Sequence, residues 1–330
     1  MNTRTLGPFT VSAVGLGCMN LSHAYGVPPA REHAAAVLRR ALDLGITFFD
    51  TAALYGFGAN ETLLGEVLAE HRSAFTLASK CGMFRNDAGV REIDGRPEVL
   101  KRTCEDSLRR LRTDVIDLYY LHRWDKRIPI EDSVGALADL VKDGKIRTIG
   151  LSEVSASTLR RAHAVHPITA VQSEYSLWSR NPEIGVLDAC RALGVSFVAF
   201  SPLARGFLTG ALTEVDTLDA KDIRRAMPRF TPAGFAANLP LLEGAKAVAS
   251  KVGCTPAQLA LAWVLAKGRD ITVIPGTTRL DHLDENAGAA AVELDAATVA
   301  ELDALFAPHA VHGPRYNAAT QAEIDTEEFA

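Results

Sequence analysis

The 330-residue sequence predicts an α/β protein, a (β/α)8 TIM barrel that forms a single domain over residues 1–330. Eight short apolar runs have the pattern of buried parallel strands, and amphipathic segments with helical spacing lie between them. Strict alternation of strand and helix leaves two architectures, an open doubly wound sheet or a closed barrel. Eight strands without a second region of distinct composition favour the barrel, and barrels of this length are common as one domain.

The eight expected strands are short and rich in β-branched residues, and the expected helices carry apolar residues on one stripe. The strands are Val11–Gly15, Ile46–Phe49, Phe75–Ser79, Val115–Leu121, Ile146–Leu151, Thr169–Gln172, Val195–Phe200 and Ile271–Ile274. The helices include Ala34–Leu44, Pro97–Leu111, Val134–Lys142, Ala156–Ala164, Pro182–Leu193 and Leu239–Lys251.

Glycines and prolines mark the boundaries of these elements. Gly45, Gly144 and Gly194 stand just before expected strands, where a left-handed C-cap ends the preceding helix. Residues 204–240 are rich in Gly, Pro, Asp and Thr, which predicts a long loop after the seventh strand that is mobile without ligand. Residues 308–330 are expected to form an extended tail, since Gly313 and Pro314 break the helical pattern.

Composition excludes several classes of protein. The net charge is -5, and the basic residues are scattered, so the sequence has no footprint for nucleic acid or for an acidic membrane. Residues 1–21 lack a basic-then-apolar leader, and no apolar run approaches the roughly 20 residues of a membrane-spanning helix. We therefore expect a cytoplasmic protein, a monomer or weak homo-oligomer. Its five cysteines are far apart and odd in number, which indicates reduced thiols and neither a disulfide framework nor a metal site.

Polar residues stand at the carboxyl ends of the expected strands, where barrels place their active sites. Asp50 ends the second strand and Lys80 the third. Asp50 alone fits a helix cap equally well. A lysine that follows apolar strand residues would be costly to bury without an acid, and Asp50 on the neighbouring strand is available.

Tyr55 and His122 complete the predicted site. Taken singly, Tyr55 is better explained as a packing aromatic and His122 as a core histidine. Together with the Asp50–Lys80 pair they suggest chemistry: the Lys80 cation would lower the pKa of Tyr55, which would act as general acid. His122 would hydrogen-bond and orient a carbonyl group. None of these groups can carry a hydride, so a nicotinamide cofactor is required.

The usual dinucleotide fingerprint is absent, because Gly15-Leu16-Gly17 lacks its third glycine and its strand-turn-helix setting. A better candidate is the loop after the eighth strand, which opens onto a helix. Its backbone N–H groups, hydroxyls and guanidinium could bind phosphate there, although a plain capped turn would have the same appearance. The loop consists of Ile274, Pro275, Gly276, Thr277, Thr278 and Arg279.

These motifs, in this order, resemble the aldo-keto reductase superfamily over nearly the whole chain. The match includes Gly45–Gly56 (GITFFDTAALYG), Ser79-Lys80, Asp117–Arg123 (DLYYLHR), Gly150-Leu151-Ser152, Ser201-Pro202-Leu203 and Glu285-Asn286. The resemblance implies a TIM barrel that reduces an aldehyde or ketone reversibly with NADPH, with hydride from the cofactor and a proton from Tyr55. NADPH is favoured over NADH. Asp50, Tyr55, Lys80 and His122 then form the catalytic tetrad.

The resemblance also implies cofactor contacts from several strand ends and loops. These residues are Gly17, Met19, Asp50, Ser152, Gln172, Phe200 (stacked on the nicotinamide), Ser201, Pro202, Leu203, Arg205, Gly206, Ile274, Gly276, Thr277, Thr278, Arg279, His282, Glu285 and Asn286. For the substrate pocket we expect Tyr25, Tyr55, Phe84, His122 and Trp124.

Two residues depart from the family pattern. Glu153 follows Ser152 where many members have Asn, so that an amide contact to the nicotinamide is lost or rerouted. His282 stands where Arg or Gln often lies near the adenosine 2′-phosphate, and Thr278 and Arg279 could replace that contact. Ser152-Glu153, with Glu174–Trp178 and Arg315-Tyr316, resembles the plant and bacterial branch that includes perakine and pyridoxal reductases.

Two other functions are compatible with the same barrel. Lys80 could be the Schiff-base lysine of a lyase, but a close Asp50 carboxylate would keep its ammonium charged. A non-catalytic module that senses its cofactor is the second alternative, as in channel-associated members of the superfamily. The presence of all four tetrad residue types argues against it.

Overall fold

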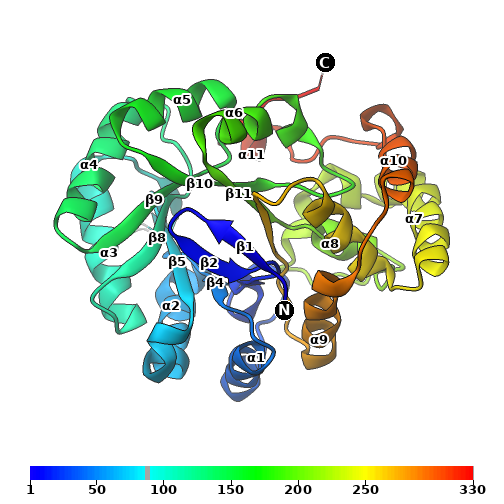
Figure 1. Ribbon diagram of the computed structural model, residues 1–330, viewed down its shortest axis with the longest axis horizontal. Coiled ribbons are helices and arrows are strands. Elements are labelled where there is room, and N and C mark those ends of the chain that lie inside the picture. Colours follow the sequence, from blue (N-terminus) through cyan, green and yellow to red (C-terminus); the bar gives the residue numbers. More distant parts are fainter. Residues whose placement is uncertain (86–89, 330) are drawn as a thin grey trace.

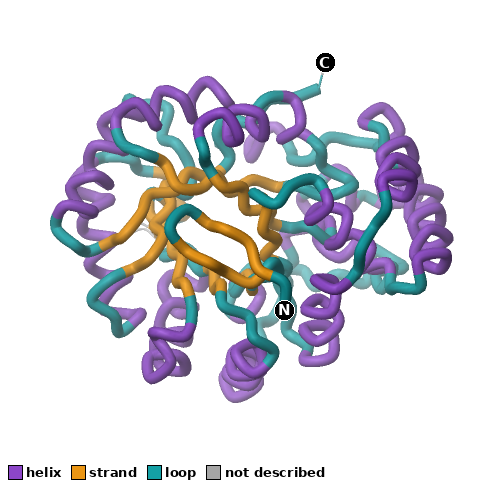
Figure 2. The backbone as a smooth tube through the Cα atoms, in the orientation of Figure 1, coloured by secondary structure: helices purple, strands orange, loops and turns teal. Residues whose placement is uncertain are grey.

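Eight parallel strands form the centre of the molecule in a computed structural model that describes residues 1–85 and 90–329. In sheet order from one edge these are β12 (Ile271–Ile274), β11 (Ser196–Phe200), β10 (Ile168–Glu174), β9 (Ile146–Ser152), β8 (Ile116–Leu121), β5 (Thr76–Cys81), β4 (Phe48–Asp50) and β3 (Leu16–Gly17). The two edges meet, because Val14 bridges Val273 and the Gly15 N–H donates to the Val273 carbonyl at 2.8 Å. The sheet is therefore a closed barrel, as predicted, and Figure 2 shows its ring of strands inside the helices.

Helices surround the barrel (Figure 1). They are α1 (Arg31–Asp43), α2 (Ala59–Leu68), α3 (Pro97–Leu111), α4 (Ile130–Lys142), α5 (Ala156–Val165), α6 (Val186–Leu193), α7 (Pro232–Val252), α8 (Pro256–Ala266), α9 (Leu280–Gly288), α10 (Ala296–Leu305) and α11 (Ala318–Ala322). Gly45, Gly144 and Gly194 have φ of 77°, 71° and 69°, the left-handed conformation expected where a helix ends before a strand.

Apolar packing occurs in two layers. The larger core lies between the strands and the helices and includes the fully buried Cys104 on α3. The smaller core fills the barrel itself with side chains such as Phe48, Leu118 and Val198. Barrel interiors are packed in this way, so the space for a ligand is at an end of the barrel and not along its axis.

The first predicted strand, Val11–Gly15, is only partly correct: Val14 and Gly15 pair with β12, but Val11 and Ser12 belong to a different strand. β2 (Phe9–Ser12) pairs antiparallel with β1 (Thr3–Leu6), and this hairpin lies across one opening of the barrel (Figure 1), where Leu6 and Val11 pack into the interior core. The barrel strand is the next segment, Leu16–Gly17. Both segments are apolar, and a strand of two residues is too short to give a periodic signal.

The excursion after β11 is shorter and more ordered than predicted. It contains turns of 3-10 helix at Ala204–Thr209, Ile223–Ala226 and Pro228–Phe230, and α7 already begins at Pro232 with Thr231 as its N-cap. Pro240, which the sequence placed at the loop end, lies within α7. Phe207 is fully buried and stacks on Trp178 with a centroid distance of 4.0 Å, so side-chain packing holds this segment.

The tail is not simply extended, since α11 and the 3-10 turn Pro308–Ala310 interrupt it; residue 330 lies outside the described residues. Backbone N–H groups at the start of α5 tie the tail to the barrel. The Ser155 N–H donates to Asp325 at 3.0 Å and the Ala156 N–H to Glu327 at 2.7 Å. The tail thus returns to the end of the barrel that carries the polar strand termini.

In the part of the chain that the structure describes, no single helix is long and apolar enough to cross a membrane. Only α7 and α8 taken as a pair meet that criterion, and their axes are bent by 85° at the break between them.

Candidate active site

The four predicted catalytic residues lie together at the carboxyl end of the barrel. Asp50 is the last residue of β4, Lys80 is in β5, and His122 directly follows β8. Tyr55 begins a 3-10 turn five residues after Asp50. Because β4, β5 and β8 are neighbours in the sheet, their polar ends converge.

Lys80 is fully buried, and all three protons of its ammonium group have an acceptor. Its Nζ contacts the Asp50 carboxylate, the Thr51 carbonyl at 2.8 Å and the Tyr55 hydroxyl at 3.2 Å. Burial alone would lower the pKa of Lys80, but the charges of Asp50 and Tyr55 raise it above its ordinary value. A buried lysine that stays charged is a poor Schiff-base nucleophile, which disfavours the lyase alternative.

Gln172, at the end region of β10, has a role that the sequence did not suggest. Its side-chain amide donates to the second Asp50 carboxylate oxygen at 2.7 Å. The carboxylate is thus held from two sides, by Lys80 and by Gln172. The contact with Gln172 fixes the orientation of the Asp50 carboxylate toward the Lys80 ammonium group.

The Lys80 cation lowers the pKa of Tyr55, as expected, but the net change in that pKa is upward. Burial raises the pKa of Tyr55 above its ordinary value, and the Lys80 cation offsets that effect only in part. The phenol is therefore protonated at neutral pH. A protonated Tyr55 is the form that donates a proton, which is what reduction requires.

His122 faces Tyr55 edge to face, with ring centroids 5.8 Å apart. Burial, followed by the charges of Arg123 and Lys80, lowers the pKa of His122 well below its ordinary value. The imidazole is therefore neutral, and a neutral imidazole has one N–H to donate and one nitrogen to accept. This suits a group that binds a carbonyl oxygen without a charge of its own.

A cavity of about 900 Å³ extends from Tyr55 and His122 to the loop after β12. Every predicted cofactor residue lines it, and so do Tyr25, Tyr55 and His122 of the predicted substrate pocket. The volume is at the upper end of the range of about 300–1,000 Å³ for small-molecule sites. Lys80 is absent from the lining because it lies behind Tyr55, buried by its three contacts.

Phe84 and Trp124, which the sequence placed in the substrate pocket, do not line the cavity. Met83 lines it instead of Phe84, since successive residues of β6 (Met83–Arg85), which pairs with β7 (Arg91–Ile93), point to opposite sides. The Trp124 indole N–H donates to the Ile128 carbonyl at 2.8 Å, and Arg161 lies over its ring. Trp124 therefore packs on the outside of the site.

The far end of the cavity is narrow and has little room for side chains. A Cβ on Gly276 would lie 2.6 Å from the Asn20 amide oxygen and 2.9 Å from the Gly17 carbonyl oxygen. Thr277 accepts the Arg279 N–H at 3.1 Å just before α9 begins at Leu280. The loop that leads into α9 thus lines the cavity, the setting in which helix starts bind phosphate.

The side chain of Arg279 is exposed and bound to Asp281, with its Nε 3.0 Å from Oδ1. The Arg205 guanidinium is also engaged: it donates to Glu174 at 2.6 Å and to the Tyr316 hydroxyl at 2.9 Å. Both residues line the cavity, but in this structure their charges are compensated within the protein.

The segment Ser201–Gly206 has a strained backbone next to the cavity. Ser201, Ala204 and Arg205 have φ of 48°, 49° and 56°, a left-handed conformation that is unfavourable for residues with a side chain. Strain of this kind is maintained where the surroundings impose it and is common at ligand sites.

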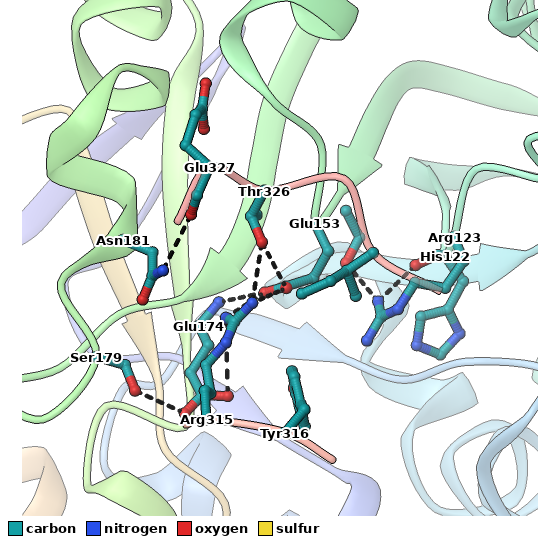
Figure 3. Close-up of polar contacts among 12 residues, drawn as sticks. His122, Arg123, Glu153, Glu174, Ser179, Asn181, Arg315, Tyr316, Thr326 and Glu327 are labelled. Atoms are coloured by element: carbon teal, nitrogen blue, oxygen red, sulfur yellow. Dashed lines mark hydrogen bonds and ion pairs between the residues drawn. The ribbon is translucent and has the colours of Figure 1, made fainter. Parts of the chain in front are cut away.

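Glu153 does not reach into the cavity. Its backbone is left-handed, with φ of 55°, and its buried carboxylate accepts hydrogen bonds from the Glu174 N–H at 2.8 Å and from Arg315 at 2.7 Å and 3.1 Å. Figure 3 shows this cluster, with Thr326 and Glu174 also in contact with Arg315. The amide contact expected of Asn at this position is therefore absent here.

Sequence reasoning missed several residues of the lining. They include Asn20, His23, Arg91 and Arg123 near the tetrad, Arg224 on the excursion, and Tyr316, Asn317, Thr320 and Glu323 on the tail. Arg123 could have been found, because it directly follows His122 in a polar strand end. The tail residues belong to no periodic element and give no local signal.

Comparison with known proteins identifies the family. The model of the aldo/keto reductase family matches residues 13–307, and the chain belongs to this family. The aldo-keto reductase yakc (NADP(+)) of Schizosaccharomyces pombe is 46% identical over 320 residues, which cover 95% of this chain and 94% of that protein.

Solved structures of the same fold are also similar. The glycerol dehydrogenase of Gluconobacter oxydans has a TM-score of 0.85 and 28% identity, with 96% of this chain and 99% of that chain covered. An aldo/keto reductase from Klebsiella pneumoniae, solved with NADP and acetate, has a TM-score of 0.74 and 28% identity, with coverage of 98% and 99%.

Proposed function

We propose that this protein is an NADPH-dependent reductase that converts an aldehyde or a ketone to the alcohol, reversibly. The observation that carries the proposal is the contact of the buried Lys80 ammonium with both the Asp50 carboxylate and the Tyr55 hydroxyl, at the end of a cavity large enough for a cofactor and a substrate. Family membership and the NADP named for two of the similar proteins support it.

Each tetrad residue has a role that follows from its contacts. Gln172 orients Asp50, Asp50 holds Lys80, and Lys80 fixes the Tyr55 hydroxyl. Tyr55 donates a proton to the carbonyl oxygen, while the neutral His122 hydrogen-bonds the same oxygen and orients the carbonyl. The lysine charge also stabilises the phenolate that remains after proton transfer.

The residues of the cavity fit a nicotinamide dinucleotide. When bound, the nicotinamide supplies the hydride that no side chain can carry. Ser152 and Gln172 would contact its carboxamide, Phe200 would stack on its ring, and the narrow backbone lining at Gly276 and Gly17 would hold its phosphates. Thr278, Arg279 and His282 would bind the adenosine 2′-phosphate, with Arg279 released from Asp281.

The finer placement in the perakine and pyridoxal reductase-like branch is part of the same proposal. The sequence features behind it, Glu153, Glu174, Arg315 and Tyr316, gather in one buried cluster in the structure (Figure 3). Features that interact physically are expected to be retained together, which supports treating them as one feature. The cytoplasmic location and the assembly as a monomer or weak homo-oligomer stay predictions from the sequence.

The test is to assay a panel of aldehydes and ketones with NADPH and NADH in parallel. The reaction is monitored as the loss of absorbance of the reduced cofactor. We expect reduction with NADPH and a lower kcat/KM with NADH. Tight NADPH binding without turnover of any substrate would favour the non-catalytic module instead.

A further inference from the structure

Most cations that line the cavity are paired with a carboxylate. Arg91 donates to Glu323 at 2.8 Å, Arg224 to Asp222 at 2.7 Å and Arg205 to Glu174 at 2.6 Å. Behind the lining, Lys80 is paired with Asp50. Each of these charges is thus balanced by the protein itself.

Arg123 differs from these residues. Its Nη1 donates to the His122 carbonyl at 2.6 Å and to the Ser152 hydroxyl at 3.2 Å, and both acceptors are neutral. Across residues 1–85 and 90–329, the hydrogen bonds of Arg123 go to neutral oxygens and no carboxylate forms an ion pair with it, although its guanidinium is partly buried. A partly desolvated charge without a counter-charge is unfavourable, so the site favours an anionic ligand.

The position of Arg123 indicates which ligand this is. Both Arg123 and His122 line the cavity, and their side chains lie next to each other and point in the same direction (Figure 3). The Nη1 contacts fix one edge of the guanidinium, while Nε and Nη2 have no hydrogen-bond partner among the described residues. An arginine fork of this kind fits a carboxylate.

We infer that Arg123 binds a carboxylate on the substrate itself, close to the carbonyl that His122 and Tyr55 receive, so that the preferred substrates are short oxo acids. The inference rests on the proposed reductase function and adds its substrate class. Under the proposed function, Ser152 would also contact the nicotinamide carboxamide, but that group is neutral and would leave the Arg123 charge uncompensated.

A matched pair of substrates tests this: phenylglyoxylic acid and its methyl ester, which share the reacting ketone. We would measure kcat/KM at saturating NADPH for the wild type, Arg123→Gln and Arg123→Lys. Arg161→Gln, which removes a charge from a half-exposed arginine outside the cavity, is the control. The ratio of kcat/KM for the acid to that for the ester is compared between variants. The difference in intrinsic reactivity between the two substrates then cancels.

Loss of a charge-assisted hydrogen bond corresponds to about a ten- to hundredfold effect. We expect Arg123→Gln to lower the acid-to-ester ratio by about that factor, Arg123→Lys to lower it less, and Arg161→Gln to leave it unchanged. An equal loss on acid and ester would overturn the inference, above all with weaker NADPH binding, since Arg123 would then serve the cofactor or position His122.

Binding of the alcohol products tests the same preference for the acid over the ester without turnover. Titration calorimetry with mandelate and methyl mandelate, in the presence of NADP+, should show that the wild type prefers mandelate and that Arg123→Gln loses this preference. Equal preference in both proteins overturns the inference. Failure of the wild type to reduce benzaldehyde or the ester with NADPH would instead count against the proposed function.

Discussion

The Arg315 guanidinium and the Glu153 carboxylate form a buried ion pair, with Nη2 2.7 Å from Oε2, that joins the tail to the residue after β9. The two residues are 162 positions apart in the sequence. The Arg315 side chain is 5% exposed and that of Glu153 0%, and Thr326 and Glu174 complete the polar surroundings of Arg315. The pair therefore fixes the tail, and with it the part of the cavity wall that includes Tyr316, Asn317 and Thr320.

Replacing Arg315 by methionine should destabilise the fold, because it leaves the Glu153 carboxylate buried without its partner. We expect a loss of about 3–5 kcal/mol in the free energy of unfolding, measured with urea. Arg91→Met is the matched control: it removes an ion pair of the same tail at a more exposed position, where about 1 kcal/mol or less is expected. Similar losses of stability for the two variants would contradict the conclusion that the buried Arg315–Glu153 pair stabilises the fold more than the exposed Arg91 pair.

Tyr55→Phe removes the proton donor and keeps the ring. We expect a loss of about 10²–10⁴-fold in kcat, or more, while the affinity for NADPH changes little. Single-turnover absorbance and a fluorescence titration with NADPH measure the two quantities separately. Retained turnover would remove Tyr55 from the role of general acid.

The low pKa of His122 makes stability depend on pH. Its unfolded pKa is near 6.5, and the buried folded form resists protonation, so the unfolded state binds more protons below that pH. Stability should therefore fall as the pH decreases from about 7 to about 5, by up to about 1.4 kcal/mol per pH unit from this group.

His122→Gln should reduce that pH dependence. Urea unfolding of both proteins across this pH range isolates the contribution of His122, because all other titrating groups are shared. An identical slope in both proteins would show that folding does not change the pKa of His122.

Gly276→Ala should weaken cofactor binding. The added methyl group would clash with the Asn20 amide and the Gly17 carbonyl and would displace the backbone that faces the expected phosphates. We expect about a tenfold higher Kd for NADPH, or about 1.4 kcal/mol. Gly135→Ala is the control, because its methyl group would enter open space on α4 and a helical alanine is favourable by roughly 0.5–1 kcal/mol.

Sequence reasoning found the residues whose positions follow from strand periodicity. Asp50, Lys80 and His122 stand at or near the ends of strands, and the parallel barrel brings such ends together whatever the loops do. The pairing of Asp50 with Lys80 was predictable in the same way, since a buried ammonium group needs an acid. The structure confirms the barrel and this ion pair.

Other features depend on contacts that no local pattern contains. The engagement of Arg205 by Glu174 and Tyr316, and that of Glu153 by Arg315, joins segments far apart in the chain. The raised pKa of Tyr55 depends on how deeply it is buried, which the sequence does not give. Val11 likewise alternates correctly for a barrel strand, and only the hairpin with β1 shows where it packs.

The β1–β2 hairpin also limits the routes by which reactants reach the site. With Leu6 and Val11 packed into the opposite end of the barrel, the dinucleotide and the carbonyl compound must enter and leave through the same mouth of the cavity. Whichever of these two molecules binds closer to Asp50 and Lys80 has to bind first and dissociate last. Steady-state kinetics should therefore follow an ordered sequence, which product-inhibition patterns would reveal.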